Sequence, residues 1–166
     1  MIQRLSQGAL LIVGGVLLEV LVGRGQLPFW WTPLVIGLAY LAAALSGGRN
    51  GSYWATATVL VGWGGVVVWL NEIRPDIFAP AAYAFGMGLG VLLAAAAARA
   101  GLRVDLLGAG LTATLAGLVF MLEPDVDAFG DATTFAVGMA VVGVFNLVLA
   151  AVKARGGGGL WRAPAG

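Results

Sequence analysis

Three glutamates occupy nearly matching places along the chain, and they are the side chains best suited to chemistry. Glu19, Glu72 and Glu123 each close an apolar run, and they are spaced 53 and 51 residues apart. If the segments that carry them surround a common axis, their carboxylates converge at one mouth of a bundle. Burial and like-charged neighbours favour the protonated form of a carboxylate. The spacing therefore predicts a proton-sensitive gate or a weak cation site. The competing interpretation is three solvated carboxylates at helix ends.

Two further side chains within the apolar runs are pore or gate candidates. Asn146 carries an amide that needs several hydrogen-bond partners in hydrocarbon, so it should face another helix or a wet lumen. Trp63 is large enough to form a constriction, although an indole at such a position also serves as packing. Both residues are compatible with a passage and with plain contact between helices.

The segment after Glu123 is rich in aspartate, and Asp125, Asp127 and Asp131 are weak candidates for a metal site. Their Asp-x-Asp…Gly order begins like a calcium-binding loop. However, Phe129 occupies the third ligand position, and Ala136 stands where a bidentate glutamate is required. We therefore expect a solvated acidic loop, with no bound metal and no cofactor.

Catalysis and nucleic-acid binding are not expected from this composition. The chain has no His and no Cys, which removes the usual near-neutral proton carrier and the thiolate nucleophile. The basic residues are distributed along the loops without forming a groove for nucleic acid. The sequence predicts a protein that is not an enzyme.

Hydrophobic composition sets the class of the protein. Hydrophobic residues make up 60% of the 166 residues, charged residues make up 10%, and the mean hydropathy is +0.96. A single soluble core cannot hide so much apolar surface, so the expected partner is a lipid bilayer. Six apolar runs of roughly 17 to 22 residues are each long enough to cross it as a helix. They are Leu5–Gly23, Leu27–Leu45, Tyr53–Leu70, Ile77–Ala98, Val104–Leu122 and Ala132–Val152.

An internal repeat organises these runs into pairs. We expect an all-α polytopic membrane protein with one six-helix domain over residues 1–155 and a flexible tail over 156–166. The domain divides into repeated two-helix hairpins over about 5–52, 53–103 and 104–155. The second helix of each hairpin has a central glycine, and small residues let helices approach closely in lipid. The candidate packing glycines are Gly37, Gly86, Gly90 and Gly138.

Charge predicts the orientation in the membrane. Seven Lys or Arg residues lie at the N-terminus, in the second and fourth loops and in the tail, whereas the opposite loops carry only Arg24 and Arg74. By the positive-inside rule we expect both termini in the cytoplasm, in the plasma (inner) membrane. Seven of the eight acidic residues fall on the outer face. That face disfavours entry of anions.

The run Leu10–Leu17 and the three-hairpin arrangement provide a resemblance. Leu-Leu-Ile-Val-Gly-Gly-Val-Leu is similar to the first-helix Leu-Leu-Tyr-Val-Gly-Ala-Val-Leu run of the amide and urea channel family. The arrangement also resembles that of the acetate uptake transporter family, which has inward termini. In place of that family's Asn-Pro-Ala-Pro-Leu-Gly-Leu opening, this chain has Leu5–Leu11, Leu-Ser-Gln-Gly-Ala-Leu-Leu. The resemblance implies a hexameric channel architecture and transfers no site residue.

Two functions from different classes follow from these features. The first is a passive channel or facilitator for a small neutral or weakly acidic solute, gated by protonation of the outer carboxylates. The second is a non-catalytic structural or accessory subunit of a membrane complex, in which the glycine faces pack against another protein. A homo-oligomer is expected in the first case.

Overall fold

The computed structural model describes residues 2–73, 79–123 and 125–156. These residues form six α-helices and no strand, which confirms the all-helical fold. The α-helices are α1 (Ile2–Leu18), α2 (Thr32–Ser46), α3 (Trp54–Ile73), α4 (Ala79–Arg99), α5 (Leu106–Leu122) and α6 (Ala132–Gly156). A π-helical turn, η1 (Glu19–Gly23), extends α1, and three 3₁₀ turns lie between helices: η2 (Phe29–Trp31), η3 (Gly48–Asn50) and η4 (Asp127–Gly130).

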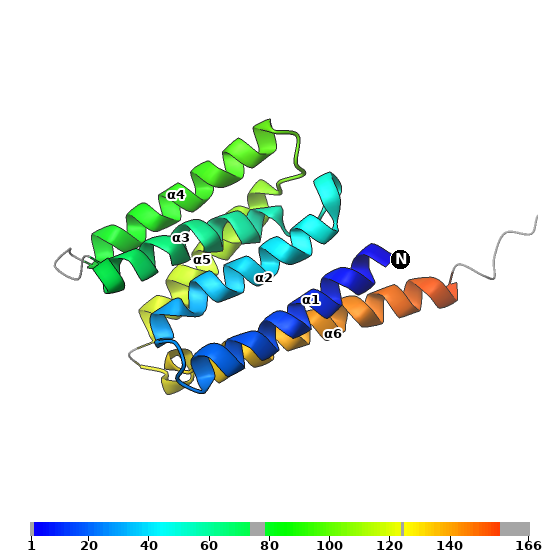
Figure 1. Cartoon of the computed structure of the whole chain (residues 1–166). Coiled ribbons are helices and arrows are strands. Elements are labelled where there is room, and N and C mark those ends of the chain that lie inside the picture. The colour runs from blue at the N-terminus through cyan, green and yellow to red at the C-terminus, as the bar shows by residue number, and fades with distance from the viewer. Residues whose placement is uncertain (1, 74–78, 124, 157–166) are drawn as a thin grey trace, which may run out of the picture.

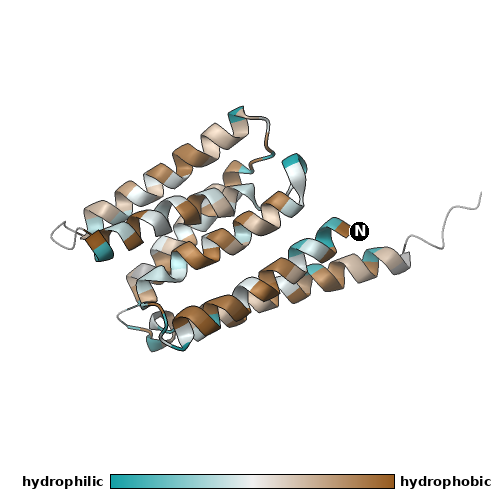
Figure 2. Cartoon of the chain, in the orientation of Figure 1, coloured by the Kyte–Doolittle hydropathy of each residue, from teal (hydrophilic) through white to brown (hydrophobic). Residues whose placement is uncertain are grey.

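Five of the helices are long and apolar enough to cross a membrane, judged by length and composition. A sixth apolar stretch, Leu106–Val119 in α5, is shorter. Figure 2 shows hydrophobic residues along every helix and hydrophilic residues mainly near the helix ends. Such helices are compatible with an integral membrane protein. The five candidate spans are Ile2–Gly23, Phe29–Ser46, Trp54–Ile73, Ala79–Arg99 and Ala132–Ala154.

Packing joins helices that are distant in sequence. Successive helices run in opposite directions, and α1 lies along α6 while α3 lies along α4 (Figure 1). Helix α2 lies between α1 and α3, and α5 contacts α3. The expected third hairpin is therefore not packed like the other two, because α1 packs on α2 and α3 packs on α4, whereas α5 and α6 barely contact one another. The packing does not confirm a threefold repeat of equivalent hairpins.

Small residues allow the two tight helix pairs to form. A Cβ atom added to Gly8 of α1 would lie 2.7 Å from the carbonyl oxygen of Gly143 in α6. In the other pair, a Cβ on Gly90 of α4 would lie 2.6 Å from the carbonyl oxygen of Val59 in α3. Backbones this close gain dispersion contacts that lipid cannot supply equally well. Around the α1–α6 pair, Leu11 belongs to a core cluster shared by α1, α2 and α6.

Candidate functional site

A cavity of about 780 Å³ lies within the bundle, and its walls come mainly from α2, α3, α5 and α6. On α3 the lining residues form one stripe with spacings of three or four residues, which places them on a single helix face. They are Thr56, Leu60, Trp63, Val67 and Asn71. The cavity is therefore bounded by one continuous face of α3.

A matching stripe lines the cavity from α5. Beside Leu111 and Ala116 of α5, which also line the cavity, its members are Gly108, Thr112, Leu115, Val119 and, one residue past the helix end, Glu123. Each stands 52 positions after its counterpart on α3, which is the offset between Gly86 and Gly138. Fifteen residues separate the first and last member of either stripe, which corresponds to about 22 Å of helix. The cavity thus follows the helix axes over much of a hydrocarbon core of about 30 Å.

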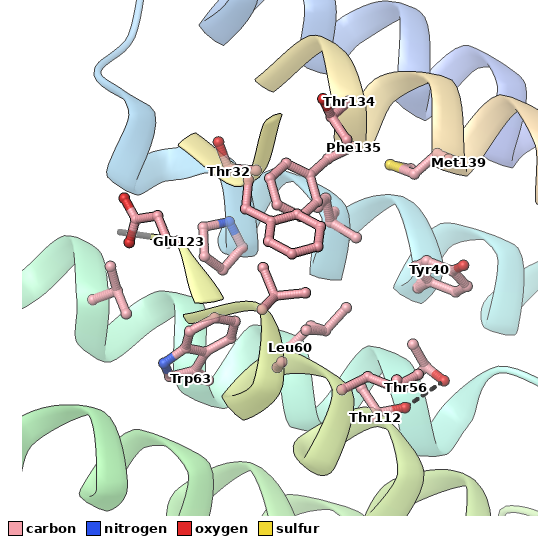
Figure 3. A pocket seen from close by; sticks show the side chains of 18 of the residues that line it. Thr32, Tyr40, Thr56, Leu60, Trp63, Thr112, Glu123, Thr134, Phe135 and Met139 are labelled. Carbon is pink, nitrogen blue, oxygen red and sulfur yellow. Dashed lines mark hydrogen bonds between the residues drawn. The ribbon is translucent and has the colours of Figure 1, made fainter. Parts of the chain in front are cut away.

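The walls from α2 and α6 are mostly apolar and aromatic. Tyr40 lines the cavity from α2, and Phe135 and Met139 line it from α6 (Figure 3). Toward the Glu123 end, the rings of Phe29 and Phe135 lie 6.2 Å apart between centroids. These walls suit a compact solute with a substantial apolar surface.

Hydroxyl groups interrupt the apolar lining at both ends of the cavity. Near the start of α3, the Thr56 hydroxyl oxygen lies 3.2 Å from that of Thr112 in α5, and the two share a hydrogen bond (Figure 3). Thr112 can also donate to the Gly108 carbonyl oxygen at 2.8 Å. Toward the other end, Thr32, Thr134 and Glu123 line the cavity. The lining therefore offers a few hydrogen-bonding groups to a mainly apolar solute.

The cavity exists where α5 and α6 do not pack along one another. Gly138 of α6 lines it, and a Cβ added there would meet no atom within 4 Å. This differs from the expected packing role, because no described helix approaches this glycine. The other three candidate packing glycines lie at helix contacts: Gly37 against Leu60 and Val61, Gly86 against Trp63 and Val66, and Gly90 against Val59.

The three candidate gate glutamates have three different environments. Glu19 lies in the π-helical turn beside Gly23, and its Oε2 atom is buried without a hydrogen-bond partner. Glu72 accepts hydrogen bonds at one oxygen from the indole nitrogens of Trp30 and Trp31, each at 3.1 Å. Of the three, Glu123 is the one that lines the cavity. The carboxylates therefore do not share the equivalent surroundings that a symmetric ring requires.

Asn146 and Trp63 contribute to the cavity in different ways. Trp63 lines it directly, and its indole nitrogen is buried with no hydrogen-bond partner. Asn146 lies one helical turn beyond Val142, a lining residue, and its Nδ2 atom donates to the Val142 carbonyl oxygen at 2.8 Å. The same nitrogen donates to the Tyr53 hydroxyl oxygen at 2.6 Å. Asn146 therefore links α6 to the start of α3.

The acidic segment before α6 is an exposed cap. Asp125, Asp127 and Asp131 are exposed, and Asp131 accepts a hydrogen bond from the Thr133 backbone nitrogen at 2.9 Å. This contact satisfies an otherwise unpaired donor at the start of α6. Among residues 2–73, 79–123 and 125–156 there is no group of three acidic side chains that could hold a metal ion.

The two stripes are not recognisable as one site from the positions of polar residues in the sequence. The 52-residue offset that relates Thr56 to Gly108 and Leu60 to Thr112 was the signal that could have paired the two stripes. Tyr40 and Tyr53 carried no periodic signal, because their contact depends on how α2 and α3 pack.

No family model, curated protein or solved structure matches this chain.

Proposed function

We propose that the chain is a passive membrane facilitator for a small neutral or weakly acidic solute, and that the cavity of about 780 Å³ is its passage. The observation that carries this proposal is the pair of stripes on α3 and α5, which follow the cavity for about 22 Å. Stripes of this length are what a solute path needs and what a local packing defect lacks. Facilitated diffusion requires no catalytic group or coupling-ion site.

The proposed orientation places Glu123 at the outer mouth. If the protein spans the plasma membrane with both termini in the cytoplasm, the C-terminal ends of α3 and α5 face outward. The acidic residues at these ends repel anions. Neutral molecules and protonated weak acids carry no negative charge and are not repelled. We include a protonation-dependent gate in the proposal and assign it to Glu123, because this carboxylate borders the passage.

The chemistry of the walls narrows the solute class. Aromatic and aliphatic side chains dominate, and the hydroxyls of Thr56 and Thr112 already bond to one another. A bare ion would lose its hydration shell against such walls without compensation. A small amide, an alcohol or a protonated carboxylic acid would lose less.

A swelling assay with proteoliposomes tests this function. Urea, acetamide, glycerol and acetate are compared at two pH values, and flux above empty vesicles is expected for neutral solutes, with acetate entering faster at the lower pH. Gly138→Leu should reduce flux several-fold because its side chain enters the cavity. The control is Gly117→Leu: Gly117 also has no atom within 4 Å of an added Cβ, but it does not line the cavity. Flux equal to that of empty vesicles for every solute would refute the function.

The second candidate function is an accessory subunit, and the exposure of α5 favours it. Leu107 and Leu118 of α5 lie outside the cavity lining and are 85% and 43% exposed, and Ala109 is the buried hydrophobic residue described on this helix. In this alternative, α5 docks on another protein, and a helix of that protein occupies the cavity. Co-purification of a stoichiometric partner whose removal precipitates the chain would support it.

The proposed facilitator is a homo-oligomer of a chain with an internal repeat. The 52-residue offset between the lining stripes supports a tandem relation between the second and third hairpins. A second copy packed on α5 would cover the exposed leucines without filling the passage. Light scattering of the protein in detergent micelles would measure the number of copies.

A further inference from the structure

A second, smaller cavity lies at the end of the bundle where α3 and α5 begin. Its volume is about 490 Å³, and polar side chains dominate its walls. Arg4 lines it from α1, Ser52 from the segment before α3, and Arg103 and Asp105 from the segment before α5. Its chemistry contrasts with that of the long apolar cavity.

The two cavities nearly meet on both α3 and α5. Ser52 lines the polar cavity, and Thr56, four residues later, lines the apolar one. On α5, Asp105 lines the polar cavity, and Gly108, three residues later, lines the apolar one. The separation on each side is therefore about one helical turn.

Tyr53 lies beside residues of both cavities. It directly follows Ser52, and its ring packs edge-on against Tyr40, a residue of the apolar cavity, with 5.3 Å between ring centroids. Its hydroxyl oxygen accepts the 2.6 Å hydrogen bond from Asn146. The side chain is thus held by α2 on one side and by α6 on the other.

We propose that Tyr53 is the closing side chain between the two cavities and that the Asn146 hydrogen bond holds it closed. This inference rests on the proposed function, since it makes the polar cavity the inner mouth of the same passage. Rotation of Tyr53 away from Tyr40 joins the two cavities into one path. A single hydrogen bond between helices in a membrane protein is weak enough to break in thermal fluctuations. Opening therefore requires no rearrangement of the helices.

Single-cysteine labelling tests the closure without any solute. The natural chain has no cysteine, so Thr56→Cys places one thiol in the apolar cavity and Ser52→Cys places one in the polar cavity. A membrane-impermeant thiol reagent is added to vesicles of each orientation. The orientation in which Ser52→Cys labels rapidly identifies the side of the polar cavity.

From that side, Tyr53→Ala is expected to speed labelling of Thr56→Cys at least tenfold and to leave labelling of Ser52→Cys unchanged. Tyr53→Phe and Asn146→Leu keep the bulk of both positions but remove the hydrogen bond, so each should speed labelling by a smaller and similar factor. Gln7→Leu is the control, because Gln7 makes its interhelical hydrogen bond outside both cavities. Labelling should not change in this variant.

Solute flux in the same variants separates this inference from the proposed function. Faster labelling of the Thr56→Cys thiol without flux of any solute would support the closure and refute the passage. Flux in the wild type, with labelling and flux unchanged in Tyr53→Ala, Tyr53→Phe and Asn146→Leu, would refute the closure and keep the passage. If Tyr53→Ala fails to elute as a folded species on size exclusion, labelling and flux in Tyr53→Phe and Asn146→Leu test the closure instead.

Discussion

The α1–α6 interface and the walls of the apolar cavity are built on similar stripes but have opposite outcomes. Along α1 the stripe contains Gly8, Leu11 and Gly15, and α6 packs directly against it. Leu60, Trp63 and Val67 of α3 have the same spacing and line the cavity, and Leu60 and Val67 take the places that Gly8 and Gly15 have on α1. Glycine lets a neighbouring backbone enter, whereas branched side chains hold it away. The comparison teaches that residue size along a helix face decides between contact and open space.

A second lesson concerns glycines that have no neighbour. Gly110 and Gly117 of α5 would carry a Cβ without meeting any atom within 4 Å, although α5 is as apolar as the tightly packed helices. A high glycine content therefore does not by itself indicate helix packing. The residues on the opposing helix decide whether a small side chain is used.

The largest expected effect comes from making α1 resemble a cavity wall. In Gly15→Val the new Cβ would lie 2.8 Å from the Ala136 carbonyl oxygen, so α6 must move away. We expect a loss of about 1–3 kcal/mol in the free energy of unfolding, as for other overpacked cores. Gly110→Val on α5 is the matched control and should leave stability nearly unchanged, because that face is open. Thermal unfolding in detergent, followed by circular dichroism, would measure both, and equal losses would contradict the comparison.

A smaller effect is expected from Gln7, the buried polar residue beside the α1 stripe. Its side chain is 2% exposed, and its Nε2 atom donates to the Ala43 carbonyl oxygen at 3.2 Å, which ties α1 to α2. Gln7→Leu should cost about 1 kcal/mol, near the values measured for such bonds in membrane proteins.

Gln3 offers a matched control one turn earlier. Its Nε2 atom also donates to a backbone oxygen, that of Gly47, at 3.2 Å, but the bond is exposed. Gln3→Leu should therefore change stability by less than about 0.5 kcal/mol. If both variants lose the same stability in the unfolding assay, burial does not distinguish the two bonds.

The smallest effect concerns the cavity wall itself. A double-mutant cycle with Thr56→Val and Thr112→Val isolates their hydroxyl contact, which joins α3 to α5. We expect a coupling of about 0.6 kcal/mol. The cycle of Thr58→Val with Thr112→Val should show none, because the Thr58 hydroxyl bonds to carbonyl oxygens of its own helix. A coupling of equal size in both cycles would show that the hydroxyl contact does not join the two walls.

The sequence by itself determined the helices and most of their bounds. The expected span Tyr53–Leu70 corresponds to α3 (Trp54–Ile73), and Val104–Leu122 corresponds to α5 (Leu106–Leu122). Helix formation within a long apolar run is local, because each backbone group bonds within its own segment. The run lengths and the polar breaks between them were therefore sufficient.

The candidate site was only partly visible in the sequence. Trp63 and Glu123 border the cavity and Asn146 supports its end, whereas Glu19 and Glu72 lie in separate environments. Side-chain type could identify polar groups in apolar runs. It could not say which of them face the same space, since that depends on the packing of several helices.

Only the tertiary structure decided that α6 pairs with α1 and that α5 stands apart from α6. Adjacent runs joined by a short loop favour a hairpin, and the repeat reinforced that expectation. The choice was instead made by non-local complementarity, in which Gly8 and Gly15 admit the α6 backbone at Gly143 and Ala136. Close contact between small residues is a property of two surfaces together. Neither surface alone specifies its partner, and the cavity is the space that this pairing leaves open.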